Sequence, residues 1–243
     1  MLILALDSTA LVGSVALCEN QKLISEITVN TGNTHSETLL PMVDSILELC
    51  GYTVDDIDLF ACTTGPGSFT GVRIGVATVK GLAYGRGKPC VGVSTPEALA
   101  YNSIMCDGIL CPVMNARRMQ VYNALFSCEQ GQMTRLCEDR ALSITELGEE
   151  LLSYDAPIYL TGDGAKLVYD TLIRENSPLT DRLILQPERI LHQSGYSVAQ
   201  VALTMFNHGL STTDAALAPV YLRPSQAERE RLAKEAENQN PLS

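Results

Sequence analysis

A glycine-rich loop between an apolar run and a helical pattern constrains the fold of this chain more than any other feature. The apolar run covers residues 59–62, and the loop reads Gly65-Pro66-Gly67-Ser68-Phe69-Thr70-Gly71. Val72, Val76 and Val79 then recur at helical spacing, so the order predicts a strand that passes straight into a helix. Glycine allows positive φ and close backbone approach, and the first amides of a helix are unpaired, so the loop offers a seat for an anion. A tight turn without a ligand is the alternative.

The common glycine-loop families do not account for this segment. A Walker A loop ends in Gly-Lys-Ser/Thr, whereas Val72 and Arg73 follow Gly71 here. A dinucleotide fingerprint has its glycines in the order Gly-x-Gly-x-x-Gly, and the third glycine of this loop comes one residue late. The loop therefore lacks the lysine of the first family and the spacing of the second.

The charge balance limits the partners of the chain. Its 243 residues carry a formal net charge of −11, which repels polyanions. We therefore expect no autonomous, high-affinity binding of nucleic acid, while a local basic patch stays open. Met1 leads into an apolar strand without preceding basic residues, and no apolar run approaches the length of a membrane span. These features predict a cytoplasmic protein that does not contact a membrane.

The cysteines and histidines form no metal-ligand pattern. None of the eight cysteines belongs to a Cys-x-x-Cys pair, and the three histidines are isolated from one another. In a reducing compartment such cysteines are most often small buried hydrophobes. We predict no metal site and no disulfide framework.

Two α/β halves follow one another along the chain. Residues 2–6, 14–18 and 22–28 read as strands, the last two joined in a hairpin. A similar opening recurs at 109–114 and 121–126, on either side of a polar segment, which makes a duplicated β-β-β-α unit plausible. Two further helices are predicted to begin at the capping-box patterns Ser94-x-x-Glu97 and Ser143-x-x-Glu146. Two more are predicted over residues 165–175 and 196–207.

The domain organisation follows from this pattern. We expect a first lobe over residues 1–103 that carries the partner interface, and a second lobe over 104–225. The helix over 195–209 is a candidate to pack back on the first lobe. The charged segment 226–243 is low in apolar residues and is expected to form a flexible tail.

Two helices of the first lobe carry residues outside their core faces that suit a partner. In the helix over 35–51, Met42 and Leu49 lie on a flank of the main apolar face. The helix that follows the glycine loop has a second face of small and apolar residues, which consists of Gly71, Gly75, Thr78 and Leu82. We predict that these six residues form a protein–protein interface, with deep packing inside a single chain as the alternative.

Four segments resemble the TsaB (YeaZ) family. They are Asp7-Ser8-Thr9, the loop 65–75 with Val72-Arg73-Ile74-Gly75, Asn115-Ala116-Arg117-Arg118-Met119-Gln120-Val121-Tyr122, and Pro219-Val220-Tyr221-Leu222-Arg223. The resemblance implies a two-lobed α/β fold of the actin-like, sugar-kinase-like ATPase (ASKHA) type. It implies a part in making threonylcarbamoyladenosine (t6A) in tRNA, beside a TsaD-like catalytic subunit and a TsaE-like ATPase. It further implies a homodimer when the chain is alone, and contact with tRNA only through the complex.

One departure from the related TsaD branch bears on catalysis. That branch places a His-x3-His metal pair on the first helix after the strand at 90–93, where this chain has Thr95 and Leu99. Neither side chain can hold a divalent metal as imidazole does. A milder departure is Asn115, where the family more often has aspartate. We therefore expect an accessory subunit without catalytic residues; an autonomous phosphotransferase of the same fold and a glycoprotease-like metallopeptidase are the alternatives.

Three loops are expected to line a vestigial nucleotide cleft. In kinases of this fold an acidic residue after the first strand helps to position Mg²⁺, and Asp7 stands there, while Ser8 and Thr9 either donate to phosphate or cap the turn. The full set is Asp7, Ser8, Thr9, Gly65, Gly67, Ser68, Gly162, Asp163 and Gly164. We expect this cleft to bind ATP or ADP weakly or not at all, and we expect no other cofactor.

Overall fold

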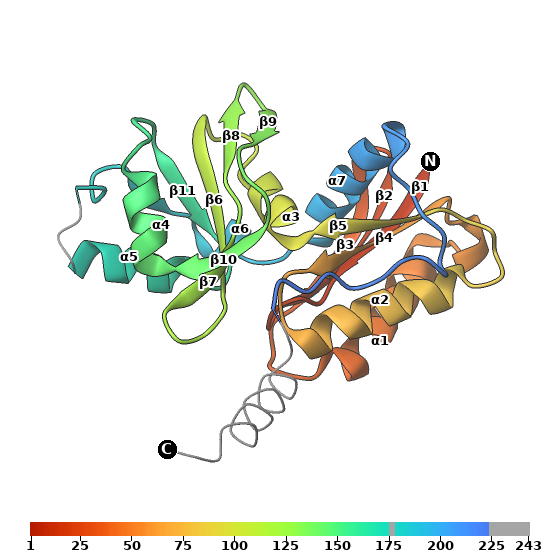
Figure 1. The fold of residues 1–243 in the computed structure, drawn as a ribbon. Coiled ribbons are helices and arrows are strands. Elements are labelled where there is room, and N and C mark those ends of the chain that lie inside the picture. The colour runs from red at the N-terminus through yellow and green to blue at the C-terminus, as the bar shows by residue number, and fades with distance from the viewer. Residues whose placement is uncertain (175–177, 224–243) are drawn as a thin grey trace, which may run out of the picture.

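The computed structural model describes residues 1–174 and 178–223, which form two α/β lobes (Figure 1). The first lobe is built on a five-stranded sheet in the order β3-β2-β1-β4-β5. Its strands are β1 (Leu2–Asp7), β2 (Gly13–Glu19), β3 (Lys22–Val29), β4 (Leu59–Gly65) and β5 (Cys90–Ser94). β1 pairs antiparallel with β2 and parallel with β4, so the sheet changes from a hairpin to a parallel arrangement at β1.

The second lobe repeats this order with an additional arm. Its seven-stranded sheet follows the path β10-β7-β6-β11-β12, with β8 paired to β6 and β9 paired to β8. The strands are β6 (Gly108–Asn115), β7 (Gln120–Asn123), β8 (Phe126–Glu129), β9 (Gln132–Arg135), β10 (Arg140–Ser143), β11 (Ile158–Thr161) and β12 (Leu183–Leu185). β6, like β1, has antiparallel and parallel neighbours, and the predicted two-lobed, actin-like α/β fold is confirmed.

Helices cover both faces of the first sheet. α1 (His35–Cys50) and α2 (Phe69–Ala83) lie on one face and α7 (Gly195–Asn207) on the other (Figure 1). Side chains alternate along β1, so Leu4 and Leu6 join the core with α1 and α2, whereas Ile3 and Ala5 join the core with α7. This coverage explains why every residue of β1 is buried.

α3 (Thr95–Tyr101) connects the two lobes. Its Ala98 packs in the first-lobe core beside α7, and its Ala100 packs with Leu110 and Phe126 of the second sheet. α4 (Ile144–Leu151) and α5 (Ala165–Arg174) cover the opposite face of that second sheet. The short helices η1 (Val54–Asp56) and α6 (Glu188–Leu191) lie in connections.

The prediction of one continuous strand over 121–126 is wrong. The structure breaks this segment into β7 and β8, and Ala124 and Leu125 lie between them. The buried Asn123 amide fills the break by donating to the carbonyl oxygens of Pro112 (2.9 Å) and Ala124 (2.8 Å). The two pieces pair with opposite ends of β6, so the break allows one segment of the chain to pair with both halves of that strand.

The chain after residue 194 lies against the first lobe, including the helix over 195–209 that was the candidate to pack there within the predicted second-lobe span of 104–225. The amides of Gly195 and Tyr196, at the start of α7, donate to side chains of β2 and β3. Further on, Thr212 forms a β-bridge with Cys90, and Leu217 is buried in the core beneath α2. Burial of this apolar residue ties the segment to the first sheet.

Two remaining expectations concern the ends of the chain and membranes. The tail predicted over 226–243 lies outside the described residues. Within residues 1–174 and 178–223, no helix combines the length and apolar character needed to cross a lipid bilayer.

Candidate functional site

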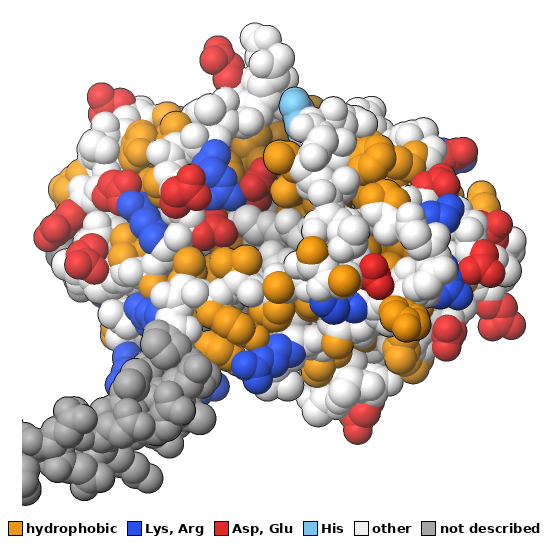
Figure 2. All heavy atoms as spheres, turned by 45° about the vertical axis from the view of Figure 1, so that its right-hand side comes forward, with side chains coloured by type: hydrophobic (Ala, Val, Ile, Leu, Met, Phe, Trp, Pro, Cys, Tyr) orange, Lys and Arg blue, Asp and Glu red, His pale blue; other side chains and the backbone are white. Residues whose placement is uncertain are grey.

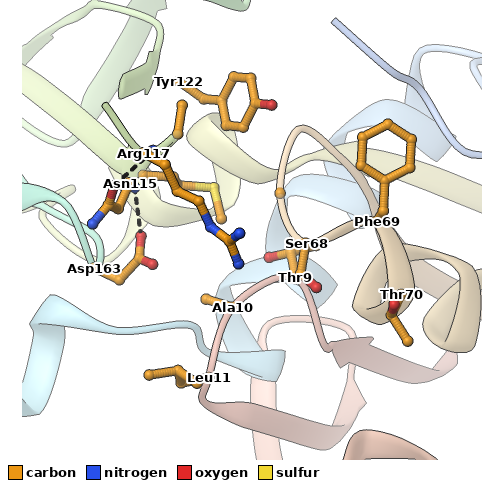
Figure 3. Close-up of a pocket in the computed structure, with 13 residues that line it drawn as sticks. Thr9, Ala10, Leu11, Ser68, Phe69, Thr70, Asn115, Arg117, Tyr122 and Asp163 are labelled. Atoms are coloured by element: carbon orange, nitrogen blue, oxygen red, sulfur yellow. Dashed lines mark hydrogen bonds between the residues drawn. The ribbon is translucent and has the colours of Figure 1, made fainter. Parts of the chain in front are cut away.

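A cavity of about 550 Å³ lies between the two lobes. Its walls come from the end of β1, the start of α2 and the loop between β6 and β7 (Figure 3). The lining residues are Thr9, Ala10, Leu11, Gly67, Ser68, Phe69, Thr70, Met114, Asn115, Ala116, Arg117, Tyr122 and Asp163. Of the residues predicted for a nucleotide cleft, the structure thus brings Thr9, Gly67, Ser68 and Asp163 together at this cavity.

Asp7 lies beneath the cavity rather than in its wall. It is 1% exposed, and its Oδ1 accepts hydrogen bonds from the Thr9 amide (2.8 Å) and the Thr9 hydroxyl (2.6 Å). Among the described residues its Oδ2 and the hydroxyl of Thr63 have no hydrogen-bond partner. Burial raises the pKa of Asp7 to about 6, although the Thr9 bonds act in the opposite direction. Here the carboxylate caps the turn that follows β1.

The glycine loop packs closely against the turn after β1. The Ser68 amide donates to the Thr9 carbonyl oxygen at 2.8 Å, and a Cβ at Gly67 would come within 2.6 Å of the same oxygen. Ser68 caps α2, because its hydroxyl accepts from the Gly71 amide at 3.3 Å. Gly65, at φ +116°, packs against Val220 instead of facing the cavity. The glycines therefore serve close packing within the chain, and part of the expected anion seat is already occupied.

Ser8 points away from the cavity. Its hydroxyl donates to the Gly71 carbonyl oxygen at 2.9 Å, and both groups are buried. This bond holds the end of β1 against the first turn of α2. Ser8 is therefore not placed to donate to a ligand in the cavity.

The loop Gly162–Gly164 closes the second-lobe side of the cavity. The Gly164 amide donates to the Val113 carbonyl oxygen at 3.0 Å, and a Cβ at Gly162 would overlap that oxygen. The Asp163 carboxylate accepts from the Asn115 amide at 3.1 Å, and desolvation by the surrounding protein raises the pKa of this side chain although part of it is exposed. Both glycines hold the end of β6, while Asp163 is the residue of this loop that lines the cavity.

Arg117 lines the cavity but is absent from the set of residues predicted for the cleft. Its side chain extends into the cavity with the guanidinium directed toward Ser68 and Thr9 (Figure 3). Arg117, Arg118 and Met119 all have left-handed backbones, with φ of 64°, 53° and 56°. Such a conformation costs roughly 1–2 kcal/mol per non-glycine residue. The sequence signal that could have pointed to Arg117 was the motif Asn115-Ala116-Arg117-Arg118. In the structure the Asn115 side chain accepts a hydrogen bond from the Arg117 amide at 2.8 Å.

Aromatic and arginine side chains border the cavity near the end of the described chain. The rings of Phe69 and Tyr221 stack with centroids 4.5 Å apart, and the Arg73 Nε donates to the Tyr221 hydroxyl at 2.7 Å. The guanidinium of Arg223 lies 5.6 Å from the ring centre of Tyr122 in the second lobe. The C-terminal motif therefore contacts both lobes beside the cavity.

Three of the residues predicted for a partner interface lie inside the chain, so that part of the prediction is wrong. Met42 is 5% exposed and belongs to the first-lobe core. A Cβ at Gly71 would overlap the Ser8 carbonyl oxygen, and one at Gly75 would come within 2.6 Å of the Ser8 hydroxyl. These glycines let the end of β1 approach α2 closely, so they do not face a partner helix.

The other three predicted interface residues reach the surface. Leu49 is 79% exposed, and Thr78 and Leu82 are half-buried. Leu49 lies on α1, whereas Thr78 and Leu82 lie on a flank of α2, where Leu82 also packs against the first-lobe core. Ala77 and Gly81 are exposed on the outer side of α2. This outer face of α1 and α2 is accessible to a partner.

The two positions that the resemblance matches to the metal pair of the TsaD branch lie in the protein interior. Thr95 is fully buried and Leu99 is 1% exposed. In the part of the chain that the structure describes, no group of three or more His, Cys, Asp or Glu side chains is suited to a metal ion. The eight cysteines are free thiols, and burial raises the pKa of Cys111 to about 12, so this thiol is inert at neutral pH.

Comparison with known proteins gives a consistent set of relatives. The profile of the family described as "TsaD: tRNA N6-adenosine threonylcarbamoyltransferase" matches residues 23–172. The chain is 34% identical over 167 residues to the Bacillus subtilis "tRNA threonylcarbamoyladenosine biosynthesis protein TsaB", which covers 69% of this chain and 73% of that protein. It is 29% identical over 237 residues to the Escherichia coli protein of the same name, with 97% and 100% covered. The solved structure of "YeaZ from Pseudomonas aeruginosa" superposes with a TM-score of 0.74 at 25% identity, with 91% and 99% covered.

Proposed function

Because the chain belongs to the TsaB (YeaZ) family, we propose that it acts in tRNA threonylcarbamoyladenosine biosynthesis as a non-catalytic subunit that pairs with a TsaD-like catalytic protein. The observation that carries the proposal is the residue pair Thr95 and Leu99. The two are buried inside the chain at the positions where the TsaD branch has metal-binding histidines, and neither side chain is a metal ligand of that kind. The proposed role includes a TsaE-like ATPase as a further partner and a cytoplasmic location.

We place the partner-binding surface on the outer face of α1 and α2. The support is the exposure of Leu49 on α1, at 79%, together with the small exposed residues Ala77 and Gly81 on α2. Nothing lies within 4 Å of a Cβ at Gly81, so a second helix can approach closely there. The same face would hold two copies together in a homodimer when the catalytic partner is absent.

The first test is capture of a purified TsaD-like subunit by variants of this face. Ala77→Arg places a long charged side chain on the surface without touching the core, and we expect at least a tenfold loss of affinity. Leu152→Arg, at the end of α4 in the second lobe and 43% exposed, is the matched control and should leave capture unchanged. Gly75→Arg would not test the surface, because its side chain would collide with Ser8. Unchanged capture by Ala77→Arg in a folded protein would refute the assignment.

The second test is reconstitution of tRNA threonylcarbamoylation. We expect product formation by TsaD-like and TsaE-like proteins to depend on this chain, and Ala77→Arg to reduce it in parallel with capture. Full product formation without the chain would contradict an accessory role. Threonylcarbamoylation by the chain alone would contradict a non-catalytic one.

We further propose that the interlobe cavity is a vestigial nucleotide cleft that binds ATP or ADP weakly or not at all. The support is that the Ser68 amide donates to the Thr9 carbonyl oxygen, which also packs against Gly67. In a functional phosphate-binding loop these groups would face the phosphate. Calorimetric titration of the isolated protein with Mg-ATP tests this directly. Binding at micromolar affinity would show that the cleft is functional.

A further inference from the structure

Four arginines line the interlobe cavity or lie next to residues that line it, in a chain whose net charge is −11. They are Arg73, Arg117, Arg118 and Arg223. Phe69 and Tyr122 line the cavity and join these arginines into one surface, because Arg73 lies 5.8 Å from the first ring and Arg223 lies 5.6 Å from the second. We call these four arginines, with Phe69, Tyr122 and Tyr221, the arginine–aromatic rim.

The arginines of the rim have no carboxylate partners among residues 1–174 and 178–223, in contrast to most other basic side chains of the protein. Those that pair with acids are Arg86, Lys88, Arg135, Arg140, Lys166 and Arg182. The acidic residue that lines the cavity is Asp163, and its carboxylate accepts from the Asn115 amide. Figure 2 shows Lys and Arg side chains beside apolar ones along the lower middle of the molecule, where few carboxylates are visible. The positive charge of the rim is therefore available to an external anion.

The backbone at the rim is held in an unusual conformation at two successive arginines. Arg117 and Arg118 follow one another in left-handed conformation, and the Asn115 side chain fixes the first by accepting from its amide. Arg117 extends into the cavity, and both Arg117 and Arg118 are exposed. Two guanidinium groups on successive residues, one in the cavity and one outside, suit successive phosphates of a chain better than one compact ion.

We propose that the arginine–aromatic rim binds a short single-stranded segment of RNA. Guanidinium groups bind the phosphates, and the half-exposed rings offer stacking faces to unpaired bases, which is the combination found in single-strand binding proteins. A duplex keeps its bases inside and leaves the rings unused. The choice of RNA over DNA rests on the proposed function, since the relatives are named for tRNA modification.

Fluorescence anisotropy of the full-length protein with a labelled 12-nucleotide single-stranded RNA tests the proposal. We expect weak, salt-dependent binding whose logarithmic salt slope lies near −2 to −3, since each phosphate contact on a single strand contributes about −0.7. A duplex of the same length should bind at least about fivefold more weakly. No detectable binding, a slope near zero, or equal binding of the duplex would each overturn the proposal.

Single substitutions locate the binding to the rim. Arg117→Ala and Arg118→Ala should each weaken binding by about 3- to 10-fold and flatten the salt slope by about 0.7, whereas Arg117→Lys should retain most of the affinity. Lys22→Ala is the matched control. It removes one positive charge from the β2–β3 hairpin, which lies beside Met1 at the opposite end of β1 from the cavity. An equal loss in the control would show that binding follows net charge and not the rim.

The same variants separate this inference from the proposed function. Arg118→Ala should leave capture of the TsaD-like subunit unchanged, since residue 118 lies in the second lobe and the proposed partner surface lies on α1 and α2. If capture persists and RNA binding is absent, only the RNA inference fails. If RNA binding is found but the TsaD-like subunit is not captured, the proposed pairing fails and the rim stands.

Discussion

The carboxylate of Asp7 is the most strongly perturbed carboxyl group near the candidate site. It is 1% exposed, accepts two hydrogen bonds from Thr9 on one oxygen and, among the described residues, none on the other. Burial raises its pKa from 3.8 to about 6, so the folded state resists ionisation more than the unfolded state does. Below about pH 4 Asp7 is neutral in both states, and its ionisation does not lower the free energy of unfolding. As the pH rises through about 6 the buried group must ionise in the folded state, and the free energy of unfolding falls.

This sign leads to a prediction for Asp7→Asn. The amide cannot ionise, and its NH₂ can donate to the Thr63 hydroxyl, which lacks a partner in the described structure. We expect the free energy of unfolding to rise by up to about 3 kcal/mol at pH 8, and by much less at pH 4.5. Urea unfolding at both pH values measures this difference, with the exposed Asp44→Asn as control. A destabilisation of the same size at both pH values would mean that the Thr9 hydrogen bonds outweigh the cost of burial.

At the scale of elements, local sequence predicted much of the first lobe and little of how its distant parts meet. The β2–β3 hairpin and α2 formed as expected, and Ser143 and Glu146 form a complete capping box at α4. The pattern at Ser94 is only half realised. The Ser94 hydroxyl caps α3, but the Glu97 carboxylate binds Arg135, a partner 38 residues away.

The same limit explains the misread interface and cavity. Helical periodicity places Gly71 and Gly75 on one face, but periodicity does not say that the end of β1 occupies that face. The stack of Phe69 on Tyr221 joins residues far apart in the chain, and no local pattern predicts such a pair. Motifs located the loops correctly, whereas tertiary packing decided which atoms face the cavity.

Glu26 illustrates how one side chain helps to hold an element that is distant in the sequence. Its Oε1 accepts from the Ser194 hydroxyl at 2.8 Å, the Tyr196 amide at 3.0 Å and the Ser14 hydroxyl at 3.1 Å. A carboxylate on β3 thus completes the N-terminus of α7, where negative charge is also favoured by the helix dipole.

We expect Glu26→Ala to lower the free energy of unfolding by about 2–3 kcal/mol, because part-buried donors lose their acceptor. Glu26→Gln keeps one acceptor oxygen and should cost less. Glu37→Ala removes an exposed carboxylate from the first turn of α1 and is the control, with an expected cost below about 1 kcal/mol. Urea unfolding measures these costs, and hydrogen exchange should show faster exchange in α7 of Glu26→Ala alone. Unchanged protection of α7 would show that its apolar face suffices to hold it.

At the scale of the whole molecule, Arg135 links the lobes. Its guanidinium contacts Asp139 at 2.8 Å within the second lobe and Glu97 of α3 at 2.7 Å, and it lies 4.7 Å from the ring centre of Phe126. α3 packs into the cores of both lobes, so its position couples them. The three charged side chains are at most 29% exposed, which places them in the range where removal of one partner is costly.

Arg135→Met therefore should do more than destabilise the second lobe. It keeps much of the apolar stem but leaves Glu97 and Asp139 without a counter-charge, and we expect a loss of about 2–4 kcal/mol. Because α3 then loses a tie to the second sheet, calorimetry should resolve separate unfolding transitions for the two lobes. Arg140→Met breaks the ion pair with Glu150, which lies wholly within the second lobe, and should lower that lobe's stability without separating the transitions. The double variant Arg135→Met/Glu97→Gln should regain part of the lost free energy of unfolding. If it does not, or if Arg135→Met unfolds in one transition as Arg140→Met does, the lobes are coupled through the apolar faces of α3 and not through its charge.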